Sequence, residues 1–124
     1  MDKNKELTSE LLAKNCYRII EDLKAENLEI YDMRDVSMLA DFYLICTANS
    51  TPHLKAIEGH LYKDLKDNLD LLPKTAKADP QSKWLVLDYR SVIIHIFGAE
   101  TREHYDIEEL WEEGIKLEVD EISS

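Results

Sequence analysis

Apolar residues recur at three- and four-residue steps in two stretches of the chain. Within residues 7–26 the recurring side chains are Leu12, Cys16, Ile19, Ile20 and Leu23. Within residues 51–72 they are Leu54, Ile57, Leu61, Leu65 and Leu72, with Asn68 continuing the stripe between the last two. This spacing places each set on one face of an α-helix, so the pattern predicts two amphipathic helices. Thr51 fits the N-cap of the second helix, Pro52 fits its first position, and Pro73 is expected to end it.

Three other stretches are patterned as strands. Residues 28–33 alternate apolar and polar side chains with period two, as a half-buried strand does. Residues 42–48 show no polar alternation, which predicts an inner strand covered on both faces. Residues 74–81 are weakly patterned and predict at most a short edge strand, because Pro80 is unsuited to a central one.

Residues 84–88 and 92–97 predict a β-hairpin that turns at Tyr89-Arg90-Ser91. With a two-residue turn, side-chain alternation gives this hairpin one aliphatic face, which we expect to line the core: Leu85, Leu87, Val92, Ile94 and Ile96. The opposite face mixes large aromatic and polar residues: Trp84, Val86, Asp88, Ile93, His95 and Phe97. Such a mixture suits a surface that a partner covers. The alternative is that helix packing buries this face and His95 is a core histidine.

The C-terminal part of the chain carries a capping signal. Asp106 and Glu109 have the spacing of a capping box, which predicts a short helix over residues 106–111, closed by Gly114. Residues 115–122 alternate apolar with charged side chains, which fits either an added strand or a loose tail.

Composition and charge indicate one domain with an acidic end. The chain has 124 residues, of which 44% are hydrophobic, and its net charge is −11. From residue 100 onward, ten acidic residues face only two basic ones. We therefore predict a single domain over residues 1–113 and an acidic tail over residues 114–124. This charge disfavours nucleic acid and suits a basic protein partner, although solubility is the simpler explanation for it.

The sequence lacks the motifs of the common catalytic, cofactor and metal sites. Its three glycines are too far apart for a phosphate loop, and neither CxxC nor HExxH occurs. We expect no cofactor and no bound metal. Cys16 and Cys46 predict free thiols in a reducing compartment, and the absence of a signal peptide or a long apolar run predicts a cytoplasmic protein.

Several segments together carry a family resemblance. They read DFYLICTANS (residues 41–50), KAI (55–57), WLVLDY (84–89), VIIHIF (92–97) and REHYDIEELW (102–111). Over residues 7–112 the chain resembles the Iojap family of ribosomal silencing factors, RsfS. At the hairpin turn, family members usually carry Gly-Asp where this chain has Arg90-Ser91.

The resemblance implies a fold, a partner and a docking site. The implied fold is α/β, a single domain with a mixed five-stranded sheet flanked by helices, similar to that of nucleotidyltransferases. Such proteins bind the large ribosomal subunit through ribosomal protein L-fourteen, block subunit association and repress translation under nutrient limitation. Trp84 matches the family's docking patch, and Asp88, His95 and Tyr105 match further prominent positions. Family members are often dimeric, so a homodimer is also expected.

The alternative function is a magnesium-dependent enzyme similar to nucleotidyltransferases. Asp41 and Asp88 are the carboxylates that would hold the ion. Such a site also needs a Gly-Ser phosphate cradle, which the chain lacks. We therefore predict that the protein is a binding module and not an enzyme.

Overall fold

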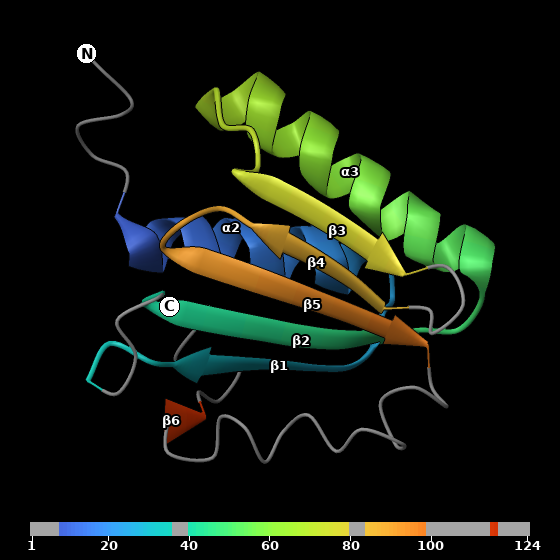
Figure 1. Ribbon diagram of the computed structural model, residues 1–124, viewed down its shortest axis with the longest axis horizontal. Helices are drawn as coiled ribbons and strands as arrows, with labels where there is room; N and C mark the ends of the chain where they lie inside the picture. The colour runs from blue at the N-terminus through green and yellow to red at the C-terminus, as the bar shows by residue number, and fades with distance from the viewer. Residues whose placement is uncertain (1–7, 36–39, 80–83, 99–114, 117–124) are drawn as a thin grey trace.

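One mixed β-sheet organises the protein (Figure 1). The computed structural model describes residues 8–35, 40–79, 84–98 and 115–116. The sheet has six strands in the order β3-β4-β5-β2-β1-β6. They are β1 (Glu26–Asp32), β2 (Phe42–Ala48), β3 (Thr75–Asp79), β4 (Trp84–Asp88), β5 (Val92–Gly98) and β6 (Ile115–Lys116). Neighbours β2 and β5 run parallel, whereas the other neighbouring pairs are antiparallel. The mixed sheet is confirmed, but the expected five strands become six because β6 pairs beside β1.

Strand β2 is the inner strand that its unbroken apolar run predicts. All seven of its residues are buried between β1 and β5. Phe42, Leu44 and Cys46 face one hydrophobic cluster, whereas Tyr43 and Ile45 face a second cluster on the other side of the sheet. Both faces of β2 are therefore covered, which explains why its sequence shows no alternation.

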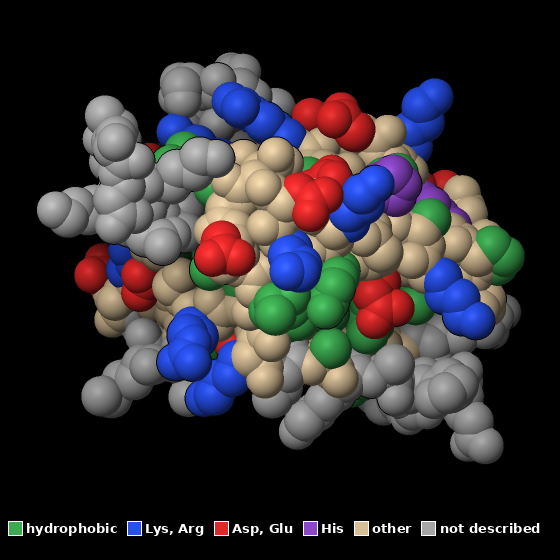
Figure 2. All heavy atoms as spheres, turned by 90° about the horizontal axis from the view of Figure 1, so that it is seen from above, with side chains coloured by type: hydrophobic (Ala, Val, Ile, Leu, Met, Phe, Trp, Pro, Cys, Tyr) green, Lys and Arg blue, Asp and Glu red, His purple; other side chains and the backbone are tan. Residues whose placement is uncertain are grey.

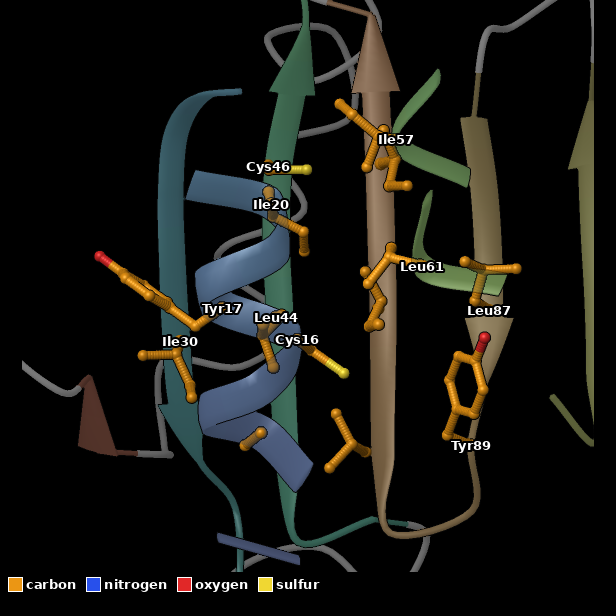
Figure 3. Close-up of a cluster of buried hydrophobic side chains, with 14 of the residues drawn as sticks. Cys16, Tyr17, Ile20, Ile30, Leu44, Cys46, Ile57, Leu61, Leu87 and Tyr89 are labelled. Carbon is orange, nitrogen blue, oxygen red and sulfur yellow. The ribbon is translucent and has the colours of Figure 1, made fainter. Parts of the chain in front are cut away.

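Two helices, α2 (Ser9–Asp22) and α3 (Thr51–Leu69), pack on the same face of the sheet. Helix α2 contacts β1, β2 and β5, and α3 contacts β2 and β5. Figure 3 shows Cys16 and Ile20 of α2 against Leu44 and Cys46 of β2. Each large aliphatic side chain buried here contributes about 1.5–3 kcal/mol relative to an exposed one. This cluster is the main core of the protein.

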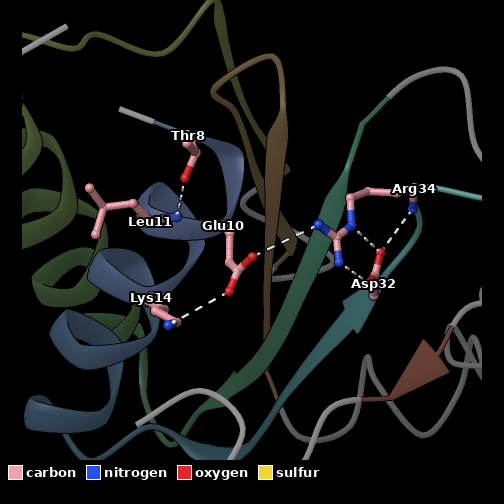
Figure 4. Close-up of polar contacts among 6 residues, drawn as sticks. All are labelled: Thr8, Glu10, Leu11, Lys14, Asp32 and Arg34. Atoms are coloured by element: carbon pink, nitrogen blue, oxygen red, sulfur yellow. Dashed lines mark hydrogen bonds and ion pairs between the residues drawn. The ribbon is translucent and has the colours of Figure 1, made fainter. Parts of the chain in front are cut away.

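Helix α2 is shorter than the range 7–26 that its periodicity predicts. The Thr8 hydroxyl caps its N-terminus by accepting the Leu11 N–H at 3.1 Å (Figure 4). The helix ends at Asp22, and Lys24 takes a left-handed φ of 60°. The Ala25 N–H then bonds to the Ile20 carbonyl, so the chain leaves the helix even though apolar spacing continues.

The expected N-cap of α3 is wrong by one residue. Ser50 is the cap, since its hydroxyl accepts the His53 N–H at 3.1 Å, and Pro52 is consequently the second helical residue rather than the first. The helix also ends earlier than Leu72. Asp70 adopts a left-handed φ of 55° and donates its N–H to the Lys66 carbonyl, which ends the helix at Leu69.

Strands β4 and β5 form the predicted hairpin. The pairs run from Trp84 opposite Phe97 to Asp88 opposite Ile93, without a bulge, so the predicted division of the two faces is confirmed. The five residues expected in the core are each at most 1% exposed: Leu85, Leu87, Val92, Ile94 and Ile96. At the tip, the Ser91 N–H donates to the Tyr89 carbonyl at 3.0 Å, which closes a three-residue γ-turn.

The two edges of the sheet agree with the weaker sequence signals. β3 forms the outermost strand beside β4, as a short edge strand was expected to do. Ile115 and Lys116 form the added strand β6, whereas residues 117–122 and the helix expected over residues 106–111 lie outside the described residues. None of the described helices combines the length and apolar content that a bilayer crossing requires.

Arg34 links the end of β1 to α2 (Figure 4). Its guanidinium bonds to both carboxylate oxygens of Asp32, at 2.6 and 3.0 Å, and lies 3.8 Å from Glu10 of α2. It also lies 5.0 Å from the ring centroid of Phe42. The hydrogen bond from Arg34 lowers the pKa of Asp32. Because the guanidinium is half exposed, we assign this link a local role in positioning rather than a large share of the stability.

Candidate functional site

The face of the sheet opposite the helices carries its own cluster of side chains. Its buried members are Tyr31, Met33, Ala40, Tyr43, Ile45 and Phe97, with Trp84 and Ile93 partly buried against them. Neither of the two helices that the structure describes packs on this face (Figure 1). We call this set, together with His95, the aromatic face. Helix packing in the described residues therefore does not explain why the hairpin carries aromatic residues here.

Trp84 and His95 are joined directly on the aromatic face. The indole Nε1–H of Trp84 donates a hydrogen bond to Nδ1 of His95 at 3.2 Å, and the two ring centroids are 6.0 Å apart. Because Trp84 pairs with Phe97 and Val86 pairs with His95, Trp84 and His95 are diagonal neighbours across the hairpin. The indole also lies 5.0 Å from the Phe97 ring, so it contacts aromatic rings from two positions of β5.

His95 is itself held among aromatic rings. Its imidazole stacks near-parallel to the Phe97 ring, with centroids 6.1 Å apart and 9° between the planes, and it lies 6.1 Å from the Tyr43 ring. Burial lowers the pKa of His95 to about 4. The imidazole is therefore neutral near pH 7, as its Nδ1 must be unprotonated to accept the Trp84 N–H. This state makes it a stable hydrogen-bond acceptor.

Asp88 shares this face of the sheet but lies away from the Trp84–His95 pair. It is four residues from Trp84 along β4, a separation of about 13 Å. Its Oδ1 accepts the backbone N–H of Arg90 at 2.7 Å, so its carboxylate helps to hold the hairpin turn. The structure thus joins two of the expected site residues and separates the third. The fourth, Tyr105, lies outside the described residues.

Tyr43 belongs to the site although the sequence did not single it out. The parallel register of β2 and β5 sets Tyr43 opposite Ile93 and so on the aromatic face. In an unbroken apolar run, no alternation marks which residues share a face with the hairpin. Only the neighbouring strand and its register identify Tyr43 as a member.

The geometry gives no support to a magnesium site at Asp41 and Asp88. Asp41 precedes β2 and Asp88 ends β4, and β5 lies between these strands. Two interstrand spacings, about 10 Å, separate their backbones, and the Asp88 carboxylate accepts the Arg90 N–H at 2.7 Å. Within residues 8–35, 40–79, 84–98 and 115–116, no three His, Cys, Asp or Glu residues are grouped to hold a metal.

The two cysteines are buried free thiols, as expected. Both lie in the main core and are 0% exposed. Burial raises the pKa of Cys16 to about 12, so this thiol stays protonated and unreactive near neutral pH. Both cysteine side chains pack in the hydrophobic core. The candidate site is therefore the aromatic face.

A family model and a curated relative carry the same family name. The family model described as "Ribosomal silencing factor during starvation", RsfS, matches residues 6–124. The Ribosomal silencing factor RsfS of Halalkalibacterium halodurans is 28% identical over 118 residues, which cover 95% of this chain and 100% of that protein. A mouse protein named "Mitochondrial assembly of ribosomal large subunit protein 1" is 39% identical over 74 residues, 57% of this chain and 32% of that protein. A crystal structure from Bacillus halodurans superposes with a TM-score of 0.74 at 29% identity, covering 90% of this chain and 100% of that one.

Proposed function

Since the chain belongs to the RsfS family of ribosomal silencing factors, we propose that it binds the large ribosomal subunit through ribosomal protein L-fourteen. A bound copy blocks association with the small subunit by occupying the surface where the two subunits meet. Translation is thereby repressed under nutrient limitation. The family comprises regulators and not enzymes, in agreement with the expectation that this protein catalyses no reaction.

The partial exposure of Trp84 is the observation that carries the docking proposal. An indole that is neither sealed in the core nor fully in solvent, set among aromatic rings, has the character of an interface anchor. The proposed docking surface is the hairpin side of the aromatic face, centred on Trp84. Asp88 extends this surface toward the hairpin turn, and Tyr105 is proposed as a further contact on the basis of the family resemblance alone.

The charge of the chain supports a basic protein as the partner. The net charge is −11, and residues 114–124 form the proposed acidic tail. Negative charge favours a cationic ribosomal protein and disfavours stray contacts with the surrounding RNA. Over α3, Figure 2 shows Lys and Arg side chains interspersed with Asp and Glu.

Three further elements complete the proposal. The protein acts in the cytoplasm, where ribosomes assemble, and it forms a homodimer when free of the ribosome. Its fold is similar to that of nucleotidyltransferases, but a shared fold does not imply shared chemistry. No cofactor takes part.

Pelleting with purified large subunits tests the docking proposal. We expect the wild-type protein to sediment with large subunits and to lower the yield of joined ribosomes when small subunits are added. Trp84→Ala removes the proposed anchor and is expected to weaken binding at least tenfold, the range of an interface hot spot. Tyr62→Ala is the matched control, because Tyr62 is an aromatic residue 47% exposed on α3, on the other side of the sheet.

The outcomes of this experiment separate the parts of the proposal. Wild-type protein that fails to sediment with large subunits would contradict the proposed partner. Equal binding by a Trp84→Ala variant with a native circular-dichroism spectrum would remove this residue from the docking surface. Binding that leaves subunit joining unchanged would contradict the steric mechanism.

A further inference from the structure

The orientation of Trp84 matters for its proposed role as an anchor. A tryptophan side chain turns about two torsions, and ordering it on binding reduces the affinity. Here the indole is restrained before any partner arrives, through the Phe97 ring at 5.0 Å and the hydrogen bond to His95 at 3.2 Å. The ring contact limits where the indole plane lies. The directional hydrogen bond additionally selects which edge of the indole points toward β5.

We propose that His95 is a positioning residue, whose Nδ1 accepts the Trp84 Nε1–H and holds the indole in its docking orientation. This inference rests on the proposed function, and it changes the role first expected for His95. In this arrangement His95 acts through Trp84 and does not itself need to touch the partner. It restrains Trp84 before binding, so that less ordering is required when the complex forms.

The surroundings of His95 suit it to this task. Its imidazole is stacked with the Phe97 ring and lies near the Tyr43 ring, so the acceptor is itself restrained. Those rings extend from β5 and β2, two neighbouring strands at the centre of the sheet. Positioning residues are most effective when rigid elements hold them. The acceptor nitrogen is thus held by side chains of the two central strands.

The arrangement also specifies what Trp84 offers to a partner. The indole N–H is engaged within the protein, so the ring surface and not the N–H is the group presented for docking. The partner's contact with Trp84 is therefore an aliphatic side chain or the stem and cation of a lysine or arginine, which pack on an indole face. This chemistry agrees with a basic protein.

Nuclear magnetic resonance of the free protein tests the positioning role directly. The Nε1–H signal of Trp84 is assigned by its loss in Trp84→Phe. We expect a downfield proton shift and slowed exchange in the wild type, because the N–H is hydrogen-bonded. His95→Phe keeps a ring but removes the acceptor, so the signal is expected to move upfield and exchange faster. His95→Asn places an amide oxygen near the position of Nδ1 and is expected to recover part of the wild-type shift.

Binding to large subunits supplies the second readout. We expect His95→Phe to weaken binding about tenfold, the effect of losing one hydrogen bond that orders the anchor, and His95→Asn to weaken it less. An unchanged Trp84 signal in a folded His95→Phe protein overturns the inference, as does unchanged affinity after the signal has moved. Failure of the proposed function would give a different set of results. In that case the wild type or Trp84→Ala gives the contradictory binding result, whereas the resonance of the free protein still reports whether His95 orients the indole.

Discussion

His53 of α3 is hydrogen-bonded to the carbonyl of Leu23, the residue that caps the C-terminus of α2. Its Nε2 lies 2.8 Å from the Leu23 oxygen, and its Nδ1 accepts the Asn49 N–H at 3.0 Å. A carbonyl can only accept, so Nε2 carries the proton and the imidazole is the neutral Nε2–H tautomer. One side chain therefore joins the end of one helix to the loop that begins the other.

His53→Ala is expected to destabilise the protein by about 1–3 kcal/mol. The substitution leaves the Leu23 carbonyl and the Asn49 N–H without the imidazole that bonds to both. Urea unfolding followed by circular dichroism measures the change. His60→Ala is the matched control, since His60 lies on the same helix and is exposed, and we expect a change within about 0.5 kcal/mol. Equal effects in the two variants would show that the His53 link contributes nothing specific.

His95 is expected to make the stability depend on pH. Its pKa is about 4 in the folded protein and 6.5 ordinarily, so the unfolded chain binds the proton first as the pH falls. The contribution of the neutral His95 imidazole to the free energy of unfolding is fully present above pH 6.5. It declines as the pH falls from 6.5 to about 4. The difference between these pKa values corresponds to about 3 kcal/mol. Urea unfolding at several pH values between 7.5 and 4 measures it.

His95→Phe separates this effect from the titration of other groups. The variant keeps the carboxylates and the remaining histidines, so the difference between the two pH profiles reports His95 alone. We expect the variant to lose less stability than the wild type over this range. Parallel profiles for the two proteins would be incompatible with a partly buried, neutral His95.

Arg90→Gly is expected to stabilise the protein by about 1 kcal/mol. Arg90 occupies a left-handed φ of 72° at the centre of the γ-turn, a conformation that costs a residue with a side chain about 1–3 kcal/mol. Glycine adopts it without that strain, although part of the gain is offset by the greater freedom of the unfolded chain. The midpoint of thermal unfolding reports the result.

Ser91→Gly provides the comparison for this turn. Ser91 is the next residue and does not have a positive φ, so glycine there only adds unfolded-state freedom. We expect it to lower the stability by up to about 1 kcal/mol. If Arg90→Gly lowers the stability as much as Ser91→Gly does, the turn at Arg90 is not strained.

Tyr89→Phe is expected to raise the free energy of unfolding by about 1 kcal/mol. The Tyr89 hydroxyl is buried against the main core and has no hydrogen-bond partner among the residues that the structure describes. Removing it avoids the cost of taking an unpaired polar group out of water. Tyr31→Phe is the contrast, because the Tyr31 hydroxyl bonds to Glu29 at 2.9 Å and its loss is expected to be destabilising. Destabilisation by Tyr89→Phe would indicate that its hydroxyl is hydrogen-bonded after all.

The sequence patterns predicted which helices form better than they predicted where those helices end. The helical stripes identified α2 and α3, yet α2 ends at Asp22 and α3 at Leu69, each short of the predicted limit. In both cases a non-glycine residue in the left-handed region, Lys24 or Asp70, follows the helix. Periodicity marks which side chains face the core, whereas the end of a helix depends on backbone conformations that these residue types do not announce.

The amino-acid pattern alone determined two helices, an inner strand and a hairpin with an aliphatic face and an aromatic face, because period and alternation are properties of consecutive residues. The tertiary structure decided that both helices cover the aliphatic side, that β2 lies parallel to β5, and that Trp84 meets His95. It also separated Asp88 from that pair and added Tyr43 to it. Apart from the Trp84–His95 contact within the hairpin, these are contacts between residues distant in the chain. They depend on strand order and register, which are set by how the whole core packs and not by any one segment.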